Sequence, residues 1–166
     1  MATWGEFESD APELALRVRR LFDAGRHKTI ATLRADGSPR ISGIECAFVD
    51  GELQFGSMTG SRKGADLQAD PRFALHGPTV HPVDGSESEW PGEAKVSGRA
   101  RFVGPLPGPA DADGDADTEA DAPAPEGDLF VADIDSVVLT SLDPSATKLV
   151  IESWSPAGGL RRVERT

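Results

Sequence analysis

The chain has 166 residues, of which 38% are hydrophobic and 6% aromatic, and it carries a formal net charge of −11. This length and composition are typical of one globular domain with one core, so we predict a single domain over residues 1–166. The acidic balance argues against a nucleic-acid-binding face, which would need a basic patch.

Most of the negative charge lies in one segment, residues 104–128. It contains eight acidic residues and five prolines but no Lys or Arg, which leaves a charge of −3 for the rest of the chain. Too few residues here can compensate for the entropy lost on ordering, so we predict a disordered acidic loop insertion. Alternating Asp residues could suggest a calcium loop, but the spacing of an EF-hand is absent.

The cysteine and histidine content of the sequence bears on disulfides, metal binding and the expected compartment. Cys46 is the only cysteine, so no disulfide can form within the chain, and we expect a small buried strand residue rather than a reactive thiol. His76 and His81 have no partners at a recognised metal-ligand spacing, so no metal site is predicted. Without a long apolar run or a signal peptide, the protein is expected to be cytoplasmic and soluble, with no membrane contact.

The first predicted elements are an arm and a helix. Residues 1–9 show no regular pattern, and we expect Trp4 and Phe7 to lie against the body. Asp10 and Glu13 have the spacing of a capping box, and an amphipathic helix is predicted from there to Gly25. Its apolar residues recur on one helical face: Leu14, Val18, Leu21 and Phe22.

Alternating and β-branched patterns then predict a mostly antiparallel sheet. Two Asp-Gly turns separate strands at 29–34, 40–49 and 53–57, which indicates a meander. Clean alternation over 93–103 predicts a strand with one buried face. We expect about six strands to close a β-barrel, the remaining strands lying at 73–76, 130–142 and 148–154, followed by a flexible basic tail.

Between two of these strands lies a candidate anion site. Ser61 is a good N-cap for a short helix that ends at Asp70-Pro71. The free amide groups of a helix start favour an anion, and Arg62 and Lys63 add two cations there. Cations at this end oppose the helix dipole unless an anion lies between them, although the same pattern also occurs on ordinary protein surfaces.

The ordered set of motifs resembles a known family. Gly60-Ser61-Arg62-Lys63, the short helix and Asp70-Pro71-Arg72 follow a hairpin that contains Asp36-Gly37 and Arg40. This order resembles the pyridoxamine 5'-phosphate oxidase-like family of split β-barrel proteins, which bind FMN or the deazaflavin F420. The resemblance covers about residues 11–103 and resumes at about residue 131.

The resemblance implies a homodimer with FMN at the subunit interface and hydride transfer to or from an unidentified small molecule. Lys95, Arg99 and the region of Trp154 would approach the partner's site. We do not infer the vitamin B6 oxidase reaction for this protein, because its sequence has no convincing version of the C-terminal substrate-binding segment of those enzymes. The cofactor-binding residues implied are Arg40, Ile41, Ser42, Ser57, Met58, Ser61, Arg62 and Lys63.

Two alternatives stay open. The protein could be an F420-dependent reductase, with a cluster of arginines for the acidic cofactor tail. It could also be a non-catalytic carrier of a flavin or of haem. For haem, His27 or His76 would be the candidate axial ligand. No nucleophile with an adjacent base is evident, so catalytic residues are left unassigned, and this gap argues against a hydrolase.

Overall fold

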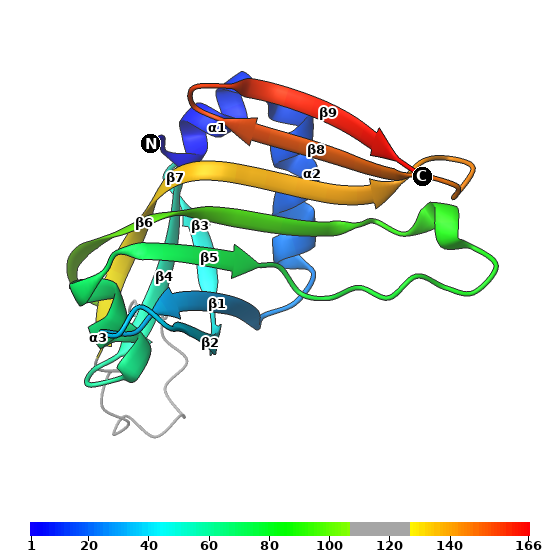
Figure 1. Cartoon of the computed structure of the whole chain (residues 1–166). Helices are drawn as coiled ribbons and strands as arrows, with labels where there is room; N and C mark the ends of the chain where they lie inside the picture. The colour runs from blue at the N-terminus through cyan, green and yellow to red at the C-terminus, as the bar shows by residue number, and fades with distance from the viewer. Residues whose placement is uncertain (107–126) are drawn as a thin grey trace, which may run out of the picture.

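The computed structural model describes residues 1–106 and 127–166. Its architecture is a strongly bent antiparallel sheet, with helices packed outside it (Figure 1). The helices in the described residues are α1 (Trp4–Asp10), α2 (Pro12–Asp23), α3 (Arg62–Ala69) and the 3-10 turn η1 (Glu87–Glu89).

The described part of the sheet has nine strands, which confirms the predicted mainly β fold. The strands are β1 (Lys28–Leu33), β2 (Pro39–Ile44), β3 (Cys46–Val49), β4 (Glu52–Met58), β5 (Arg72–His76), β6 (Glu93–Pro105), β7 (Gly127–Leu142), β8 (Leu149–Ser155) and β9 (Gly159–Arg165).

Strand β7 organises the sheet. One of its edges pairs with β6 along nearly its whole length. The other edge pairs with β4 over residues 127–131 and with β8 over residues 137–142. Between these two partners, Ala2 forms a two-way backbone bridge with Ile134, with N–O distances of 2.9 and 2.7 Å.

The prediction of a closed barrel of about six strands is wrong. The strand order is β2-β1-β5-β6-β7-β4-β3, with β8 and β9 attached at β7, and the two end strands β2 and β3 do not pair with each other. The sheet therefore bends around a core without closing.

Residues 1–9 do not form the predicted arm. Thr3 caps α1 through a capping box, in which its hydroxyl accepts from the Glu6 amide and the Glu6 carboxylate accepts from the Thr3 amide. The expectation that Trp4 and Phe7 lie against the body is confirmed, because both side chains are fully buried. Burial of these two aromatic rings stabilises a helix of only seven residues, which would be marginal alone.

The capping box predicted at Asp10 and Glu13 is also wrong. Asp10 is the last residue of α1, and α2 begins at Pro12 with Ala11 as its N-cap and no side-chain cap. Proline at the first helical position has no amide that needs a partner, so it starts the helix instead. The amphipathic helix itself is confirmed, because the predicted apolar face is buried: Leu14, Val18, Leu21 and Phe22.

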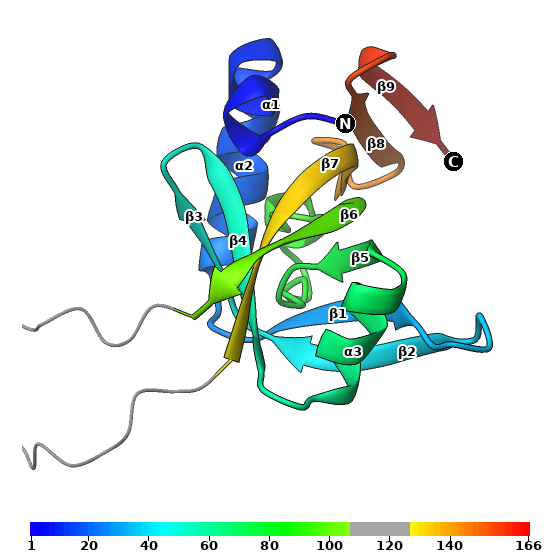
Figure 2. The same ribbon diagram turned by 90° about the vertical axis from the view of Figure 1, so that its left-hand side faces the viewer.

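The core runs from the part of the sheet that α1 and α2 cover (Figure 2) to the inner side of α3, where Leu67 is buried. Phe7 packs between two tryptophans, with ring centroids 5.1 Å from Trp4 and 4.9 Å from Trp154. Trp154 is buried at 1% exposure, so it packs in its own chain's core. This aromatic cluster joins the N-terminal helices to strand β8.

The strand predicted over residues 40–49 is two strands. β2 pairs with β1, whereas β3 pairs with β4, and Glu45 lies between them outside both strands. Glu45 is exposed, and the chain changes partners there. Alternation continues across the break, and for this reason the pattern alone cannot reveal it.

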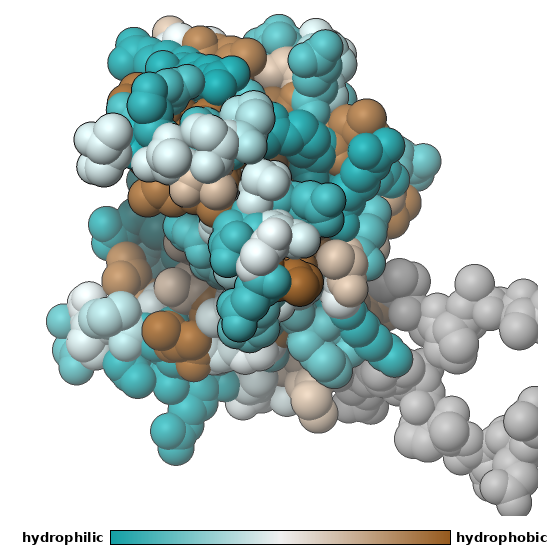
Figure 3. All heavy atoms as spheres, turned by 90° about the vertical axis from the view of Figure 1, so that its right-hand side faces the viewer, coloured by the Kyte–Doolittle hydropathy of each residue, from teal (hydrophilic) through white to brown (hydrophobic). Residues whose placement is uncertain are grey.

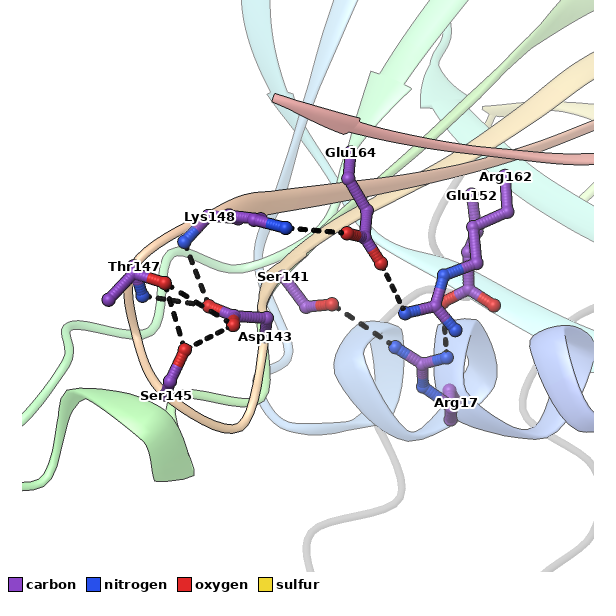
Figure 4. Close-up of polar contacts among 9 residues, drawn as sticks. All are labelled: Arg17, Ser141, Asp143, Ser145, Thr147, Lys148, Glu152, Arg162 and Glu164. Carbon is purple, nitrogen blue, oxygen red and sulfur yellow. Dashed lines mark hydrogen bonds and ion pairs between the residues drawn. The ribbon is translucent and has the colours of Figure 1, made fainter. Parts of the chain in front are cut away.

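The C-terminal residues form β9 rather than a flexible tail, and they pair with β8 from Gly159 to Arg165. Ion pairs support this hairpin (Figure 4): Glu164 contacts Arg162 at 3.2 Å and Lys148 at 3.4 Å. On the next strand, Glu152 forms an ion pair with Arg17 of α2. The hairpin is thus tied to the helix that covers the sheet.

The predicted acidic insertion falls mostly outside the described residues. β6 runs to Pro105 and β7 begins at Gly127, so both ends of the 104–128 segment belong to strands, and residues 107–126 lie outside the description. No helix in the described ranges has the length and apolarity needed to cross a bilayer. Hydrophilic residues cover most of the face drawn in Figure 3, and the apolar ones form separate small patches.

Truncation of Phe7 tests the aromatic cluster. We expect Phe7→Ala to lower the free energy of unfolding by about 3–5 kcal/mol, because the side chain is fully buried and the cavity cannot collapse fully. Leu16→Ala is the control, since Leu16 lies in α2 but is 51% exposed, and it should cost under ~0.5 kcal/mol. Urea unfolding followed by tryptophan fluorescence measures both, and equal losses would contradict this packing.

Asp143, in the loop between β7 and β8, should make the stability of the fold depend on pH in the acid range. Asp143 accepts hydrogen bonds from the Ser145 hydroxyl and the backbone amides of Lys148 and Thr147, and these lower the pKa of its carboxyl to about 2 (Figure 4). The carboxylate therefore stabilises the fold above its unfolded pKa of about 3.9, and this contribution disappears as pH falls to 2.

We expect Asp143→Asn to have a lower melting temperature than the parent at pH 7 and to approach it at pH 2. Thermal unfolding across this range measures the difference. A gap that stays constant with pH would show that the charge of Asp143 does not contribute.

Candidate functional site

The start of α3 is built as the sequence predicted. Ser61 is the N-cap, and its hydroxyl accepts from the Gly64 amide at 3.1 Å. The Ser61 hydroxyl also bonds that of Ser57 at the end of β4. The Lys63 ammonium donates to the Gly43 carbonyl of β2 at 2.8 Å, so the first turn of α3 is fixed to two strands.

Close packing at this turn requires a glycine at position 64. A Cβ placed there would lie 2.8 Å from the Ser57 hydroxyl oxygen and 3.1 Å from that of Ser61. The side chain of any other residue would therefore push the two serines apart. The absence of a Cβ at Gly64 lets the hydroxyls of two elements meet beneath the helix start.

A groove of about 500 Å³ opens beside this turn. Its walls come from the end of β2, the end of β4 and α3. Met58 is 74% exposed at its edge, and a Cβ placed on Gly43 would have nothing within 4 Å. The residues that line it include Gly43, Ile44, Glu45, Gly56, Met58 and Lys63.

Opposite charges also meet among the residues that line the groove. Arg26 and His27 also line it, and the Arg26 guanidinium donates to Glu45 at 2.9 Å, while the His27 imidazole lies 3.8 Å from the same carboxylate. Glu45 therefore offsets the positive charge of Arg26, whereas Lys63 forms no ion pair among the described residues and adds positive charge on the α3 side. This polarity would orient an anionic ligand with its negative group toward α3.

Arg40 contacts α3 instead of the groove. Its Nε donates to Asp66 Oδ2 at 2.6 Å, and Nη2 lies 3.5 Å from Oδ1. Thr32, which faces Arg40 across the β1–β2 pair, donates its hydroxyl to Asp66 Oδ2 at 2.8 Å. The Arg40 guanidinium, with help from the Thr32 hydroxyl, holds the pKa of the Asp66 carboxyl below its ordinary value.

The structure separates the other two residues predicted on β2 from the groove. Ile41 is 76% exposed on the outer face of the sheet, where it lines a second hollow of about 420 Å³ with Lys95 and His76. Ser42 is half-buried on the same side of β2 as Arg40 and does not line the groove. The groove thus gathers Met58 and Lys63, with Ser57 and Ser61 supporting the turn and Arg62 exposed on it.

Cys46 lies in a smaller hollow next to the groove, and burial raises the pKa of its thiol to about 11. The thiolate is therefore scarce at neutral pH, in agreement with the predicted unreactive strand cysteine. Among the described residues, no three His, Cys, Asp or Glu side chains gather where they could hold a metal ion.

Sequence reasoning missed three charged participants: Arg26, Glu45 and Asp66. Glu45 could have been noticed as a charged residue inside a strand pattern otherwise free of carboxylates. Asp66 gives no such signal, because an acidic residue in the middle of a short helix is ordinary. Its role depends on Arg40, which is 26 positions away in the chain.

Gly64 offers a direct test of the packing under α3. In an open helix Gly→Ala stabilises by about 1 kcal/mol, but here we expect Gly64→Ala to lower the melting temperature because the methyl group displaces Ser57 and Ser61. The double variant Ser57→Ala/Gly64→Ala should recover part of the loss. Gly5→Ala in α1 is the control, since its Cβ would make only ordinary contacts. A stabilised Gly64→Ala protein would contradict this geometry.

Solved structures share the fold. A pyridoxamine 5'-phosphate oxidase-related, FMN-binding protein from Nostoc punctiforme is 13% identical, with 96% of each chain covered and a TM-score of 0.59. PhzG from Burkholderia lata, solved with tetrahydrophenazine-1-carboxylic acid, is 13% identical, with 94% of this chain and 87% of that chain covered and a TM-score of 0.55.

A heme binding protein from Mycobacterium smegmatis is 14% identical, with 91% of this chain and 87% of that chain covered and a TM-score of 0.51. At these identities the likeness establishes the fold alone. No curated protein matches the chain in sequence.

The family itself is recognised in the sequence. The family model described as pyridoxamine 5'-phosphate oxidase matches residues 17–140, well over half of the chain. The match includes the strands and the helix that build the groove. It confirms the resemblance inferred from the motifs around Ser61 and Asp70. The chain belongs to the pyridoxamine 5'-phosphate oxidase family.

Proposed function

We propose that this protein binds a phosphate-bearing flavin-type cofactor, FMN in the first instance, in the groove between β2, β4 and α3. The observation that carries the proposal is the start of α3, where Ser61 and Lys63 fix a basic turn at one end of a groove of about 500 Å³. This volume lies in the range of small-molecule sites. Membership of the family and the FMN-binding neighbour support the choice of cofactor.

The residues at the groove fit the two ends of FMN. The phosphate would lie at the first turn of α3, where unpaired backbone amides meet the side chains of Arg62 and Lys63. The planar ring would lie along the backbone near Gly43 and Met58, because Gly43 has no side chain to obstruct it. Ser57 and Ser61 would support the phosphate-binding turn from below.

A bound flavin supplies hydride transfer, and the chain's own residues bind and orient it. We propose an oxidoreductase acting on a small molecule for this reason. Lys63 would hold the phosphate, and Glu45 with Arg26 would set the charge near the other end of the groove. The protein would act as a homodimer, because the groove is open on one side and the exposed side chains of Ile41 and Met58 would be covered by a second copy.

Two alternative functions would use the same groove. F420 also carries a phosphate that α3 could hold, so an F420-dependent reductase is consistent with this geometry. A non-catalytic haem carrier is the other, because His27 lies on the groove with its imidazole 83% exposed and could serve as an axial ligand. FMN ranks before haem because the α3 turn is suited to a phosphate.

Binding of FMN, riboflavin, F420 and haem to the ligand-free protein tests the proposal. We expect Lys63→Ala to weaken FMN roughly 10- to 100-fold, the effect of one charge-assisted hydrogen bond, and to leave riboflavin unchanged. Lys148→Ala removes a lysine from the β8–β9 side of the fold and should change neither affinity. Fluorescence quenching measures the affinities for FMN, riboflavin and F420, and absorbance follows the binding of haem.

Haem binding without flavin binding would favour the carrier candidate. Equal weakening of FMN and riboflavin by Lys63→Ala would show that Lys63 does not hold the phosphate. Failure of the parent protein to bind either flavin or F420 would overturn the proposed function.

A further inference from the structure

We propose that the smaller hollow beside the groove, here called the β3–β4 hollow, is a substrate subsite that takes the apolar ring or chain of an uncharged molecule. The inference rests on the proposed function and deepens it, because it names the class of substrate that would meet the cofactor. It is carried by the position of the hollow, which shares Glu45, Gly56 and Leu106 with the groove.

The β3–β4 hollow lies where β3, β4 and the start of β7 run side by side (Figure 2). On β4, Phe55 points into the core at 2% exposure, so its neighbours Gln54 and Gly56 face the opposite side of the sheet. Their cross-strand partners, Ala47 on β3 and Leu129 on β7, face the same side. The hollow is therefore on the outer face of the sheet and separate from the core.

Leu106 forms the wall between the hollow and the groove. Its backbone amide donates to the Gly127 carbonyl at 2.8 Å. A Cβ placed on Gly56 would lie 2.7 Å from Leu106 Cδ2, and one placed on Gly127 would lie 2.5 Å from Leu106 Cδ1. The leucine side chain can lie there because both neighbours are glycines. It separates two spaces that two ligands could occupy side by side.

Volume and position indicate what the hollow would hold. It measures about 270 Å³, compared with about 500 Å³ for the groove. Sites for whole small molecules usually measure ~300–1,000 Å³, so the hollow suits a small ring system rather than a second cofactor. Hydride transfer needs donor and acceptor in contact, with the reacting atoms about 3–3.5 Å apart. A space that adjoins the groove is therefore where the reaction partner of a bound flavin would lie.

The charges around the hollow indicate the class of molecule. Among the described residues that line it, Glu45 is the only charged one, and its carboxylate already accepts from Arg26 at 2.9 Å. The side chains of Leu106 and Leu129 offer only aliphatic carbon. An anion would lose water there without a cation to compensate, which is unfavourable. The half-buried amide of Gln54 could bond one hydroxyl or carbonyl group of an uncharged ligand.

The test uses two probes that share one ring system and differ in charge, 2-naphthol and the anion 2-naphthoate. Isothermal titration calorimetry measures their binding to the FMN-loaded protein at pH 7. We expect 2-naphthol to bind without releasing FMN, and 2-naphthoate to bind at least ~10-fold more weakly because its charge would be buried without a partner.

Ala47→Leu fills the hollow and leaves the groove unchanged, because Ala47 lines the hollow but not the groove and is exposed on β3. We expect this variant to bind 2-naphthol at least ~10-fold more weakly and FMN within about 2-fold of the parent. Ala74→Leu is the matched control, since it makes the same change at an exposed position of β5 beside the hollow of Ile41 and His76. Neither affinity should change in the control.

If Ala47→Leu does not fold, Leu106→Ala replaces it. Removal of the wall joins the hollow to the groove, so the affinity for the three-ring homologue 2-anthrol should rise about tenfold relative to that for 2-naphthol. An unchanged ratio would overturn the inference.

Three other results would overturn the inference and leave the proposed function intact. Release of FMN by 2-naphthol would assign the hollow to the cofactor, and equal binding of both probes would contradict the class of substrate. An unchanged 2-naphthol affinity in Ala47→Leu would show that the probe binds elsewhere. Failure of FMN to bind would overturn the proposed function and, with it, the assignment of the hollow to a substrate.

Discussion

The antiparallel pairing of β6 with β7 is the interaction on which the rest of the structure depends. The two strands shift register at Ser97/Gly98, where a Cβ on Gly98 would collide with the carbonyl of Asp133. This close approach gives the sheet an irregular, bent centre. The first part of β7 then holds β4, which leads into α3, and its last part holds the β8–β9 hairpin.

The site inherits its rigidity from this arrangement. β4 ends at Met58 against the beginning of β7, and α3 starts four residues later, with the hydroxyl of its N-cap Ser61 bonded to that of Ser57. Lys63 and Asp66 reach back to β2, so one short helix is attached to β2 at one end of the sheet path and, through Ser61 and Ser57, to β4 near the other. A turn held in this way is preorganised, so a ligand that bound there would not have to order it.

Much of the fold could be predicted from periodicity, because burial of one face leaves a regular record in the sequence. The α2 face is confirmed, and the alternation of β6 is confirmed from Ala94 to Ala100, beyond which Phe102 is 53% exposed. The elements that were predicted wrongly have no such regular pattern of burial that is specific to them. Helix α1 is too short to show a period, and β2 and β3 keep one alternation across a change of partner. The exposed strand β9 has no buried face to record.

The sequence by itself determined the family, the β architecture and the Ser61 start of α3, because strand alternation, turn residues and an N-cap act over a few neighbouring positions. Only the tertiary structure decided that Arg40 faces Asp66 and that the chain changes strand partners at Glu45. It also decided that Gly64, having no side chain, leaves room for two serine hydroxyls. These features depend on which distant groups meet. Local sequence cannot encode that choice, since a guanidinium can pair equally well with a carboxylate or a phosphate until the fold places one beside it.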